Sequence, residues 1–212
     1  MKLVLASSNA GKLAELNVLL GDSGIELLSQ RTLGIDDAEE TGKTFVENAL
    51  LKARKAALES GLPALGDDSG LCVDALDGAP GLYSARYAGA HGEAEANINK
   101  LLRQLDGVPD AQRSAYFHCV VALLRHADDP RPIIAEGRWH GRILTTRRGT
   151  AGFGYDPVFL DVEHGRSAAE MDAVLKNRIS HRGQALAALK AALASLVGGV
   201  SAPMHDQHER RG

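Results

Sequence analysis

Residues 66–89 read GDDSGLCVDALDGAPGLYSARYAG, and the interpretation of the whole chain starts from this stretch. An apolar run at residues 62–65 leads into two adjacent carboxylates, Asp67 and Asp68, and a second apolar run follows at residues 71–73. The pattern predicts two strands with the carboxylates at a strand-to-turn junction. Carboxylates so placed can bind a divalent metal, because hard cations take oxygen ligands. A hairpin with a solvated acidic turn is the alternative.

The N-terminal segment predicts an anion site. The run from Leu3 to Ala6 is typical of a buried strand, and a small polar loop then leads into a helix that stops near Gly21. A helix start after such a loop directs backbone N–H groups at an anion. Lys12 opposes the helix dipole, which a bound phosphate would explain. An exposed cap with a solvated lysine is the alternative. The candidate phosphate contacts are Ser7, Ser8, Asn9, Ala10, Gly11 and Lys12.

An acidic loop at residues 36–44 ends in Gly42-Lys43-Thr44, which imitates the end of a P-loop. That motif requires a glycine at position 37, where this chain has Asp, so a P-loop is rejected. Thr44 and Glu47 instead predict a capping box that opens a helix reaching about Ser60. Asn48 and Lys52 then share one helix face near the acidic loop.

The rest of the chain predicts further helices and strands. A strand is expected at residues 25–28, an amphipathic helix at 93–105, and a strong strand at 115–124. Residues 133–139 and 142–146 are expected to form two antiparallel strands around a turn at 139–141. Short connections between strands indicate an antiparallel or mixed sheet.

The glycine-rich loop at residues 149–157 is the second informative loop. Its glycines allow close approach to a flat ligand, and Phe153 and Tyr155 offer faces for stacking. The alternative is a turn whose aromatic rings pack into the core. Ser167 and Glu170 predict a capping box that opens a short helix toward Lys176. His181 and Arg182 begin the final helix, and residues 198–212 are predicted to be a disordered tail.

Bulk properties limit the class of protein. The chain has 212 residues and a net charge of −3, so no general basic field favours nucleic acid or an anionic membrane. Its two cysteines, Cys72 and Cys119, form no metal motif and are expected to be buried free thiols. The N-terminal apolar run is too short for a signal peptide. We expect one domain over residues 1–197, in the cytoplasm.

These loops supply binders for a triphosphate, a metal and a base. The candidate metal ligands are Asp68 and two residues of the acidic loop, Glu39 and Glu40. Five ordered motifs then strongly resemble the inosine/xanthosine triphosphate pyrophosphatase family over about residues 3–196. They are SSNAGK, EETGKTFVENALLKA, DDSGLCVDALDGAPGLYSARYAG, GFGYDPVF and SHRGQAL.

The resemblance implies an elongated mixed α/β sheet flanked by helices, with a nucleotide cleft between two lobes, and a homodimer. It implies Mg²⁺-dependent hydrolysis of noncanonical purine triphosphates (ITP, dITP, XTP) to monophosphate and pyrophosphate. Asp68 would be the general base and a metal ligand, with Glu39 or Glu40 as a second ligand. Residues 80–89 would form the cleft wall or a dimer surface. The implied nucleotide contacts are Ser7 to Lys12, Lys52, Ser69, Phe153, Gly154, Tyr155, Asp156, Lys176, His181 and Arg182.

Base selection has a physical basis. Hypoxanthine and xanthine carry a 6-oxo group, which donors such as Lys176 or Arg182 would favour over the 6-amino group of adenine. A mismatch of that kind can discriminate by roughly 10⁴-fold or more. Two other functions stay open: a nucleotide sensor without turnover, and a pyrophosphatase for modified pyrimidine nucleotides.

Overall fold

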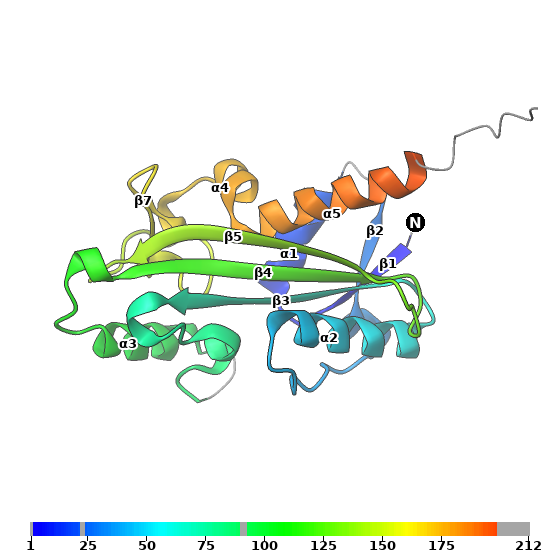
Figure 1. Ribbon diagram of the computed structural model, residues 1–212, viewed down its shortest axis with the longest axis horizontal. Helices are drawn as coiled ribbons and strands as arrows, with labels where there is room; N and C mark the ends of the chain where they lie inside the picture. Colours follow the sequence, from blue (N-terminus) through cyan, green and yellow to red (C-terminus); the bar gives the residue numbers. More distant parts are fainter. Residues whose placement is uncertain (1, 22–23, 90–92, 199–212) are drawn as a thin grey trace, which may run out of the picture.

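The computed structural model describes residues 2–21, 24–89 and 93–198 of the chain. The described strands form one seven-stranded sheet in the order β2-β1-β3-β4-β5-β6-β7 (Figure 1). β1 runs parallel to β2 and β3, and the pairs from β3 to β7 are antiparallel, so the predicted mixed α/β sheet is confirmed. The strands are β1 (Lys2–Ala6), β2 (Glu26–Ser29), β3 (Ala64–Val73), β4 (Ser114–Leu124), β5 (Ile133–Ile143), β6 (Phe159–Asp161) and β7 (Arg166–Ser167).

The strand-to-turn junction expected at the two carboxylates is wrong. β3 runs unbroken from Ala64 to Val73 and pairs with β4 along its whole length. Successive side chains of a strand point to opposite faces, so Asp67 and Asp68 face different layers of the molecule. Cationic side chains meet them from both faces, which allows two charged residues to lie inside a buried strand.

The turn expected at residues 139–141 is also wrong, because β5 is one continuous strand that ends at Ile143. Trp139 is buried, and its indole Nε1 donates to the Asp161 carboxylate at 2.6 Å. Gly141 permits close approach of β6, because a Cβ there would collide with the Leu160 carbonyl oxygen. These contacts keep the segment in the sheet despite its turn-like sequence.

Helices cover both faces of the sheet. α2 (Phe45–Ser60) packs small residues against β3 and β4, with Ala49 and Ala53 beside Val120 and Ala122. α1 (Ala10–Leu20) and α5 (His181–Gly198) share a core with Leu3, Leu5 and Leu65 on the opposite face (Figure 1).

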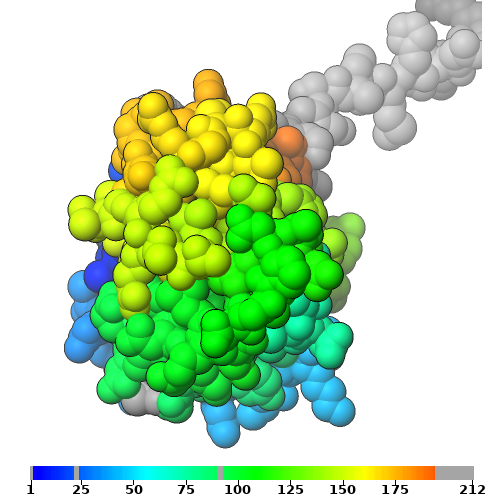
Figure 2. Space-filling model, turned by 90° about the vertical axis from the view of Figure 1, so that its left-hand side faces the viewer, coloured from blue at the N-terminus to red at the C-terminus, as the bar shows by residue number. Residues whose placement is uncertain are grey.

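A second large core lies at the other end of the long strands. It joins α3 (Ala94–Gln104) to Leu71, Phe117, Trp139 and Phe159. Figure 2 views the molecule from this end, with the surface around α3 below that of residues 160–175. The core supports the loop that precedes β6 and thereby holds one side of the site.

Sequence signals at the helix ends are largely confirmed. Thr44 and Glu47 form the predicted capping box of α2, and Gly61 closes the helix at φ 67°. Ser167 and Glu170 also form a capping box, but it opens only a 3-10 turn. The helix expected there is α4 (Ala173–Ile179), which Asp172 caps separately.

The remaining expectations concern the thiols, the tail and membrane spans. Both cysteines are buried and free, as predicted. Gly198 still belongs to α5, and the rest of the predicted tail, 199–212, lies outside the described residues. Among the described helices, none combines the length and apolarity that crossing a bilayer requires.

Candidate active site

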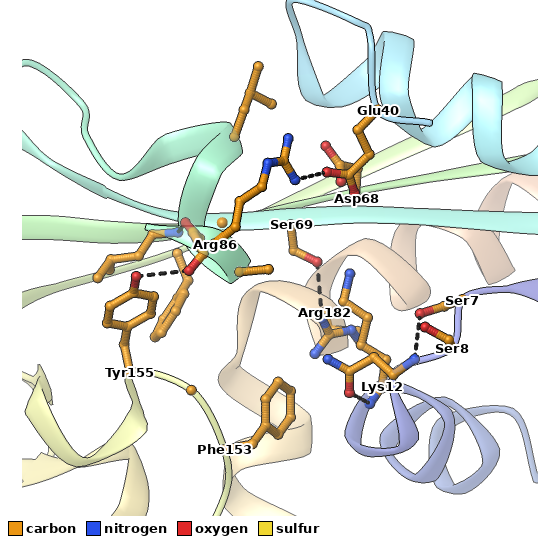
Figure 3. A pocket seen from close by; sticks show the side chains of 18 of the residues that line it. Ser7, Ser8, Lys12, Glu40, Asp68, Ser69, Arg86, Phe153, Tyr155 and Arg182 are labelled. Atoms are coloured by element: carbon orange, nitrogen blue, oxygen red, sulfur yellow. Dashed lines mark hydrogen bonds and ion pairs between the residues drawn. The ribbon is translucent and has the colours of Figure 1, made fainter. Parts of the chain in front are cut away.

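A cavity of about 660 Å³ opens beside the middle of β3. It collects side chains from α1, the acidic loop, α2, the 3-10 segment Gly81–Arg86, the glycine-rich loop, α4 and α5 (Figure 3). Nearly all the predicted site residues line it, except Ala10 and Gly11. Those in the lining are Ser7, Ser8, Asn9, Lys12, Glu39, Glu40, Lys52, Asp68, Ser69, Phe153, Gly154, Tyr155, Asp156, Lys176, His181 and Arg182.

Asp67 is the buried anchor of one side of the site. Its carboxylate accepts from Arg182 Nε at 2.8 Å, from Ser69 Oγ at 2.6 Å and from Lys12 Nζ. Burial alone would raise the Asp67 pKa, but Arg182 and Lys12 outweigh it and hold that pKa well below its usual range. Lys12 is therefore neither a solvated lysine nor a free phosphate ligand in this state, because its charge is paired with Asp67.

The loop before α1 is only partly available to an anion. Asn9 Oδ1 accepts from the backbone N–H groups of Gly11 and Lys12 at 2.9 and 3.1 Å. Ser8 Oγ donates to Asp37 at 2.6 Å. The expected display of backbone N–H groups is thus wrong for Gly11 and Lys12, because the N-cap side chain satisfies both.

Asp68 faces a different set of partners. Its Oδ1 lies 2.6 Å from Lys52 Nζ, which is also 2.5 Å from Glu40 Oε1. Arg86 donates to the other oxygen of Glu40 (Figure 3). Asp68 Oδ2 is buried, and no hydrogen-bond partner for it exists among the described residues. An unmade bond at a buried acceptor costs about 1–3 kcal/mol, so a ligand that completes it would be favoured.

The two carboxylates of this group differ in their protonation behaviour. Burial raises the pKa of Asp68 above its usual value, although Lys52 partly offsets the rise. Burial would also raise the pKa of Glu40, but Lys52 and Arg86 outweigh burial and lower this pKa to about 2. Burial would lower the Lys52 pKa, yet Asp68 and Glu40 raise it, so this lysine stays charged at neutral pH.

Asp68 and Glu40 form a candidate metal site. Within the described residues, three or more His, Cys, Asp or Glu side chains nowhere gather in a metal-binding arrangement. Mg²⁺ commonly binds one or two carboxylates and completes its shell with waters and substrate phosphates. A carboxylate pair around one cation position, with a free Asp68 oxygen, fits that requirement. Glu39 also lines the cavity but is exposed, so the geometry favours Glu40 as the second ligand.

A chain of ion pairs joins α1, the glycine-rich loop, α4 and α5 at the cavity. Lys176 Nζ lies 2.7 Å from Asp156 and 3.0 Å from Glu15, and Glu15 also pairs with Arg182. Sequence reasoning missed Glu15, although it stands one helical turn after Lys12, and it missed Arg86 as the partner of Glu40. Both are ordinary surface-type residues whose role depends on long-range pairing.

The two aromatic rings of the glycine-rich loop have different roles. Phe153 is 37% exposed, with Lys176 Nζ 5.1 Å and Arg182 Cζ 5.9 Å from its ring centre. Tyr155 is buried in the core, and its hydroxyl donates to the Ser84 carbonyl at 2.9 Å. The stacking interpretation therefore suits Phe153, whereas the core-packing alternative holds for Tyr155.

His181 is a neutral group at the floor of the cavity. Its ring stacks on Phe117 with 4.8 Å between centres, and its buried Nδ1 has no partner among the described residues. Burial and the neighbouring Arg182 lower its pKa well below the usual value. The imidazole is therefore uncharged at neutral pH.

Comparison with known proteins shows the family of this chain. The model of the Ham1 family matches residues 3–192. The chain belongs to the Ham1 family. The predicted family and the predicted enzyme class, a hydrolase, are thereby confirmed.

Similar members of the Ham1 family come from several bacteria. A dITP/XTP pyrophosphatase from Xanthomonas campestris is 61% identical over 92% of this chain and 98% of its own length. A dITP/XTP pyrophosphatase from Shigella flexneri is 56% identical over 91% of this chain and 98% of its own length. The solved structure of a HAM1 protein from Coxiella burnetii has a TM-score of 0.84 and 51% identity, covering 92% of this chain and 99% of that one.

Proposed function

We propose that this protein is a Mg²⁺-dependent pyrophosphatase that converts noncanonical purine triphosphates, dITP, ITP and XTP, to monophosphates. The observation that carries the proposal is that one cavity brings a carboxylate pair together with a cluster of cations and an exposed aromatic ring. Asp68 and Glu40 flank Lys52, whereas Phe153 lies against the start of α1 at Gly11 and beside the buried cations Lys176 and Arg182. A volume of about 660 Å³ is suitable for a nucleotide.

Asp68 is proposed as the general base. It would take a proton from the water that attacks the α-phosphorus, and burial raises its pKa, which favours acceptance of a proton. Lys52 and Lys12 would offset the negative charge that develops on the departing pyrophosphate. Mg²⁺ held by Asp68 and Glu40 would supply Lewis-acid stabilisation of the phosphate oxygens.

Base selection is proposed to come from Phe153 and the two cations beside it. Phe153 would stack on the purine, while N–H donors of Lys176 or Arg182 would reach its 6-oxo group. Adenine offers an amino donor there and would leave the buried cations unmatched. Glu15 and Asp156 hold these cations in place, so they would act as positioning residues.

Initial rates of pyrophosphate release from ITP, dITP, XTP, ATP and GTP test the proposal. We expect kcat/KM for the noncanonical nucleotides to exceed that for ATP by about 10²-fold or more. Equal rates with ATP would contradict the specificity, and inorganic phosphate as the first product would contradict the reaction. Nucleotide binding without turnover would support the sensor function instead.

The substitution Asp68→Asn tests the base directly. It keeps the size of the side chain but removes the proton acceptor, so we expect kcat to fall by about 10³-fold while nucleotide binding persists. Exposed Asp36, in the neighbouring acidic loop, provides a matched Asp36→Asn control that should retain activity. Retention of most activity by Asp68→Asn would remove Asp68 from this role.

The expectations about the assembled protein also stay proposals. We propose that residues 1–197 form one domain with two lobes that flank the cavity, that the protein is a homodimer, and that it lies in the cytoplasm. Light scattering during gel filtration would measure the mass in solution, and a monomer at micromolar concentration would contradict the homodimer.

A further inference from the structure

Lys52 lies between the two carboxylates of the candidate metal site. Its ammonium nitrogen is 2.6 Å from Asp68 Oδ1 and 2.5 Å from Glu40 Oε1, and its side chain is only 13% exposed. Arg86 pairs with the second oxygen of Glu40. The cation position between the carboxylates is therefore already filled by a residue of the protein.

The charges at this position balance without a metal. Two carboxylates face two cations, so a divalent ion that arrived alone would meet no net negative charge. It would also be repelled by the Lys52 ammonium at close range, where a unit charge acts strongly even at an effective dielectric constant of about 20. A bare metal ion should consequently bind weakly.

We propose that the Lys52 ammonium occupies the metal position in the free protein, where it neutralises Asp68 and Glu40. When the metal binds, the ammonium moves away from these carboxylates and pairs with the substrate phosphates. The inference rests on the proposed function. The negative charge of the triphosphate neutralises the positive charge of the displaced Lys52 ammonium and of the metal. Metal and nucleotide therefore bind with positive coupling, because each removes the electrostatic cost of the other.

The position of Lys52 makes the exchange feasible. It projects from the middle of α2 into the cavity that Lys12 and the loop before α1 also line. A lysine side chain has a flexible four-carbon stem, so its ammonium can change partners without movement of the helix. Asp68 keeps a second oxygen with no partner among the described residues, which leaves the carboxylate incompletely satisfied by Lys52 alone.

Titration of the nucleotide-free protein with Mn²⁺, followed by the electron paramagnetic resonance signal of the free ion, tests this exchange. We expect Lys52→Gln to bind Mn²⁺ at least about tenfold more tightly than the wild type. Arg86→Gln should change affinity in the same direction by about threefold, and it serves as a second variant because Arg86 pairs with the other oxygen of Glu40. Lys43→Gln removes an exposed positive charge near Glu40 in sequence and should leave the affinity unchanged.

Asp68→Asn separates this inference from the proposed function. If Asp68→Asn weakens Mn²⁺ binding while Lys52→Gln and Arg86→Gln leave it equal or weaker than in the wild type, the exchange is overturned and the metal site stands. If the double variant with Asp68→Asn and Lys52→Gln binds Mn²⁺ as tightly as Lys52→Gln alone, the metal does not use this carboxylate, and both fall. Circular dichroism and a thermal melt of each variant establish that it is folded.

Discussion

Asp67 and Asp68 are adjacent residues with separate functions. Because they alternate across β3, Asp67 meets Arg182 and Lys12 while Asp68 meets Lys52. Their surroundings move the two pKa values in opposite directions, as expected where one carboxylate is structural and the other reactive. The sequence predicts the pair and the greater importance of Asp68. It does not predict the partners, because these come from other elements, between 16 and 115 residues away in sequence.

Asp67→Asn should be among the most destabilising substitutions in the site. It removes the negative charge from a fully buried position, leaves Lys12 without its carboxylate and leaves Arg182 with Glu15 alone, a change that costs about 3–5 kcal/mol. Urea unfolding at pH 7 measures the free energy of unfolding. Exposed Asp106→Asn is the control and should change it by less than about 0.5 kcal/mol. A loss below 1 kcal/mol for Asp67→Asn would contradict the pairing.

His181 should make stability depend on pH. Burial holds its pKa well below the ordinary value, whereas an unfolded histidine takes up a proton near pH 6.5. Below that pH the unfolded state therefore binds more protons, and stability falls by up to about 1.4 kcal/mol per pH unit. We expect His181→Gln to lose less stability than the wild type between pH 7 and 5.5 in urea unfolding. Exposed His126→Gln should follow the wild type, and an unchanged pH slope in His181→Gln would contradict the assignment.

At the scale of elements, glycines set how closely helices approach the sheet. Gly66 on β3 faces the backbone of α2 near Ala49, and Gly137 on β5 faces the start of α5 near His181. The element types and most boundaries follow from hydrophobic period and capping residues, which act locally. The turns predicted within β3 and β5 are wrong, because local sequence favours a turn at charged residues and glycines. In the folded protein, contacts with distant segments keep these residues in the strands.

Gly137→Ala tests the packing of α5. The added Cβ would collide with the His181 carbonyl oxygen and lie 2.6 Å from the Ala185 nitrogen, so α5 must shift. We expect a loss of about 1–3 kcal/mol in the free energy of unfolding. Displacement of His181 and Arg182 should lower kcat/KM as well. Gly21→Ala is the matched control, because a Cβ there meets nothing within 4 Å. Wild-type stability in Gly137→Ala would contradict the close contact.

At the scale of the whole molecule, the site is assembled from segments that span most of the chain. Five ordered motifs predict these segments, and sixteen of the predicted residues do line one cavity. The ion-pair partners Glu15 and Arg86 escape prediction, because a charged residue on a helix or loop is usually solvated surface. Only the packing of α1 against α5, and of residues 81–86 against the acidic loop, reveals them.

Hydrolysis of ITP in water enriched with ¹⁸O, followed by mass spectrometry of both products, tests the central claim most directly. If a water positioned by Asp68 attacks the α-phosphorus, one ¹⁸O atom appears in the inosine monophosphate and the pyrophosphate stays unlabelled. Label in the pyrophosphate, or release of inorganic phosphate with inosine diphosphate, would contradict the account.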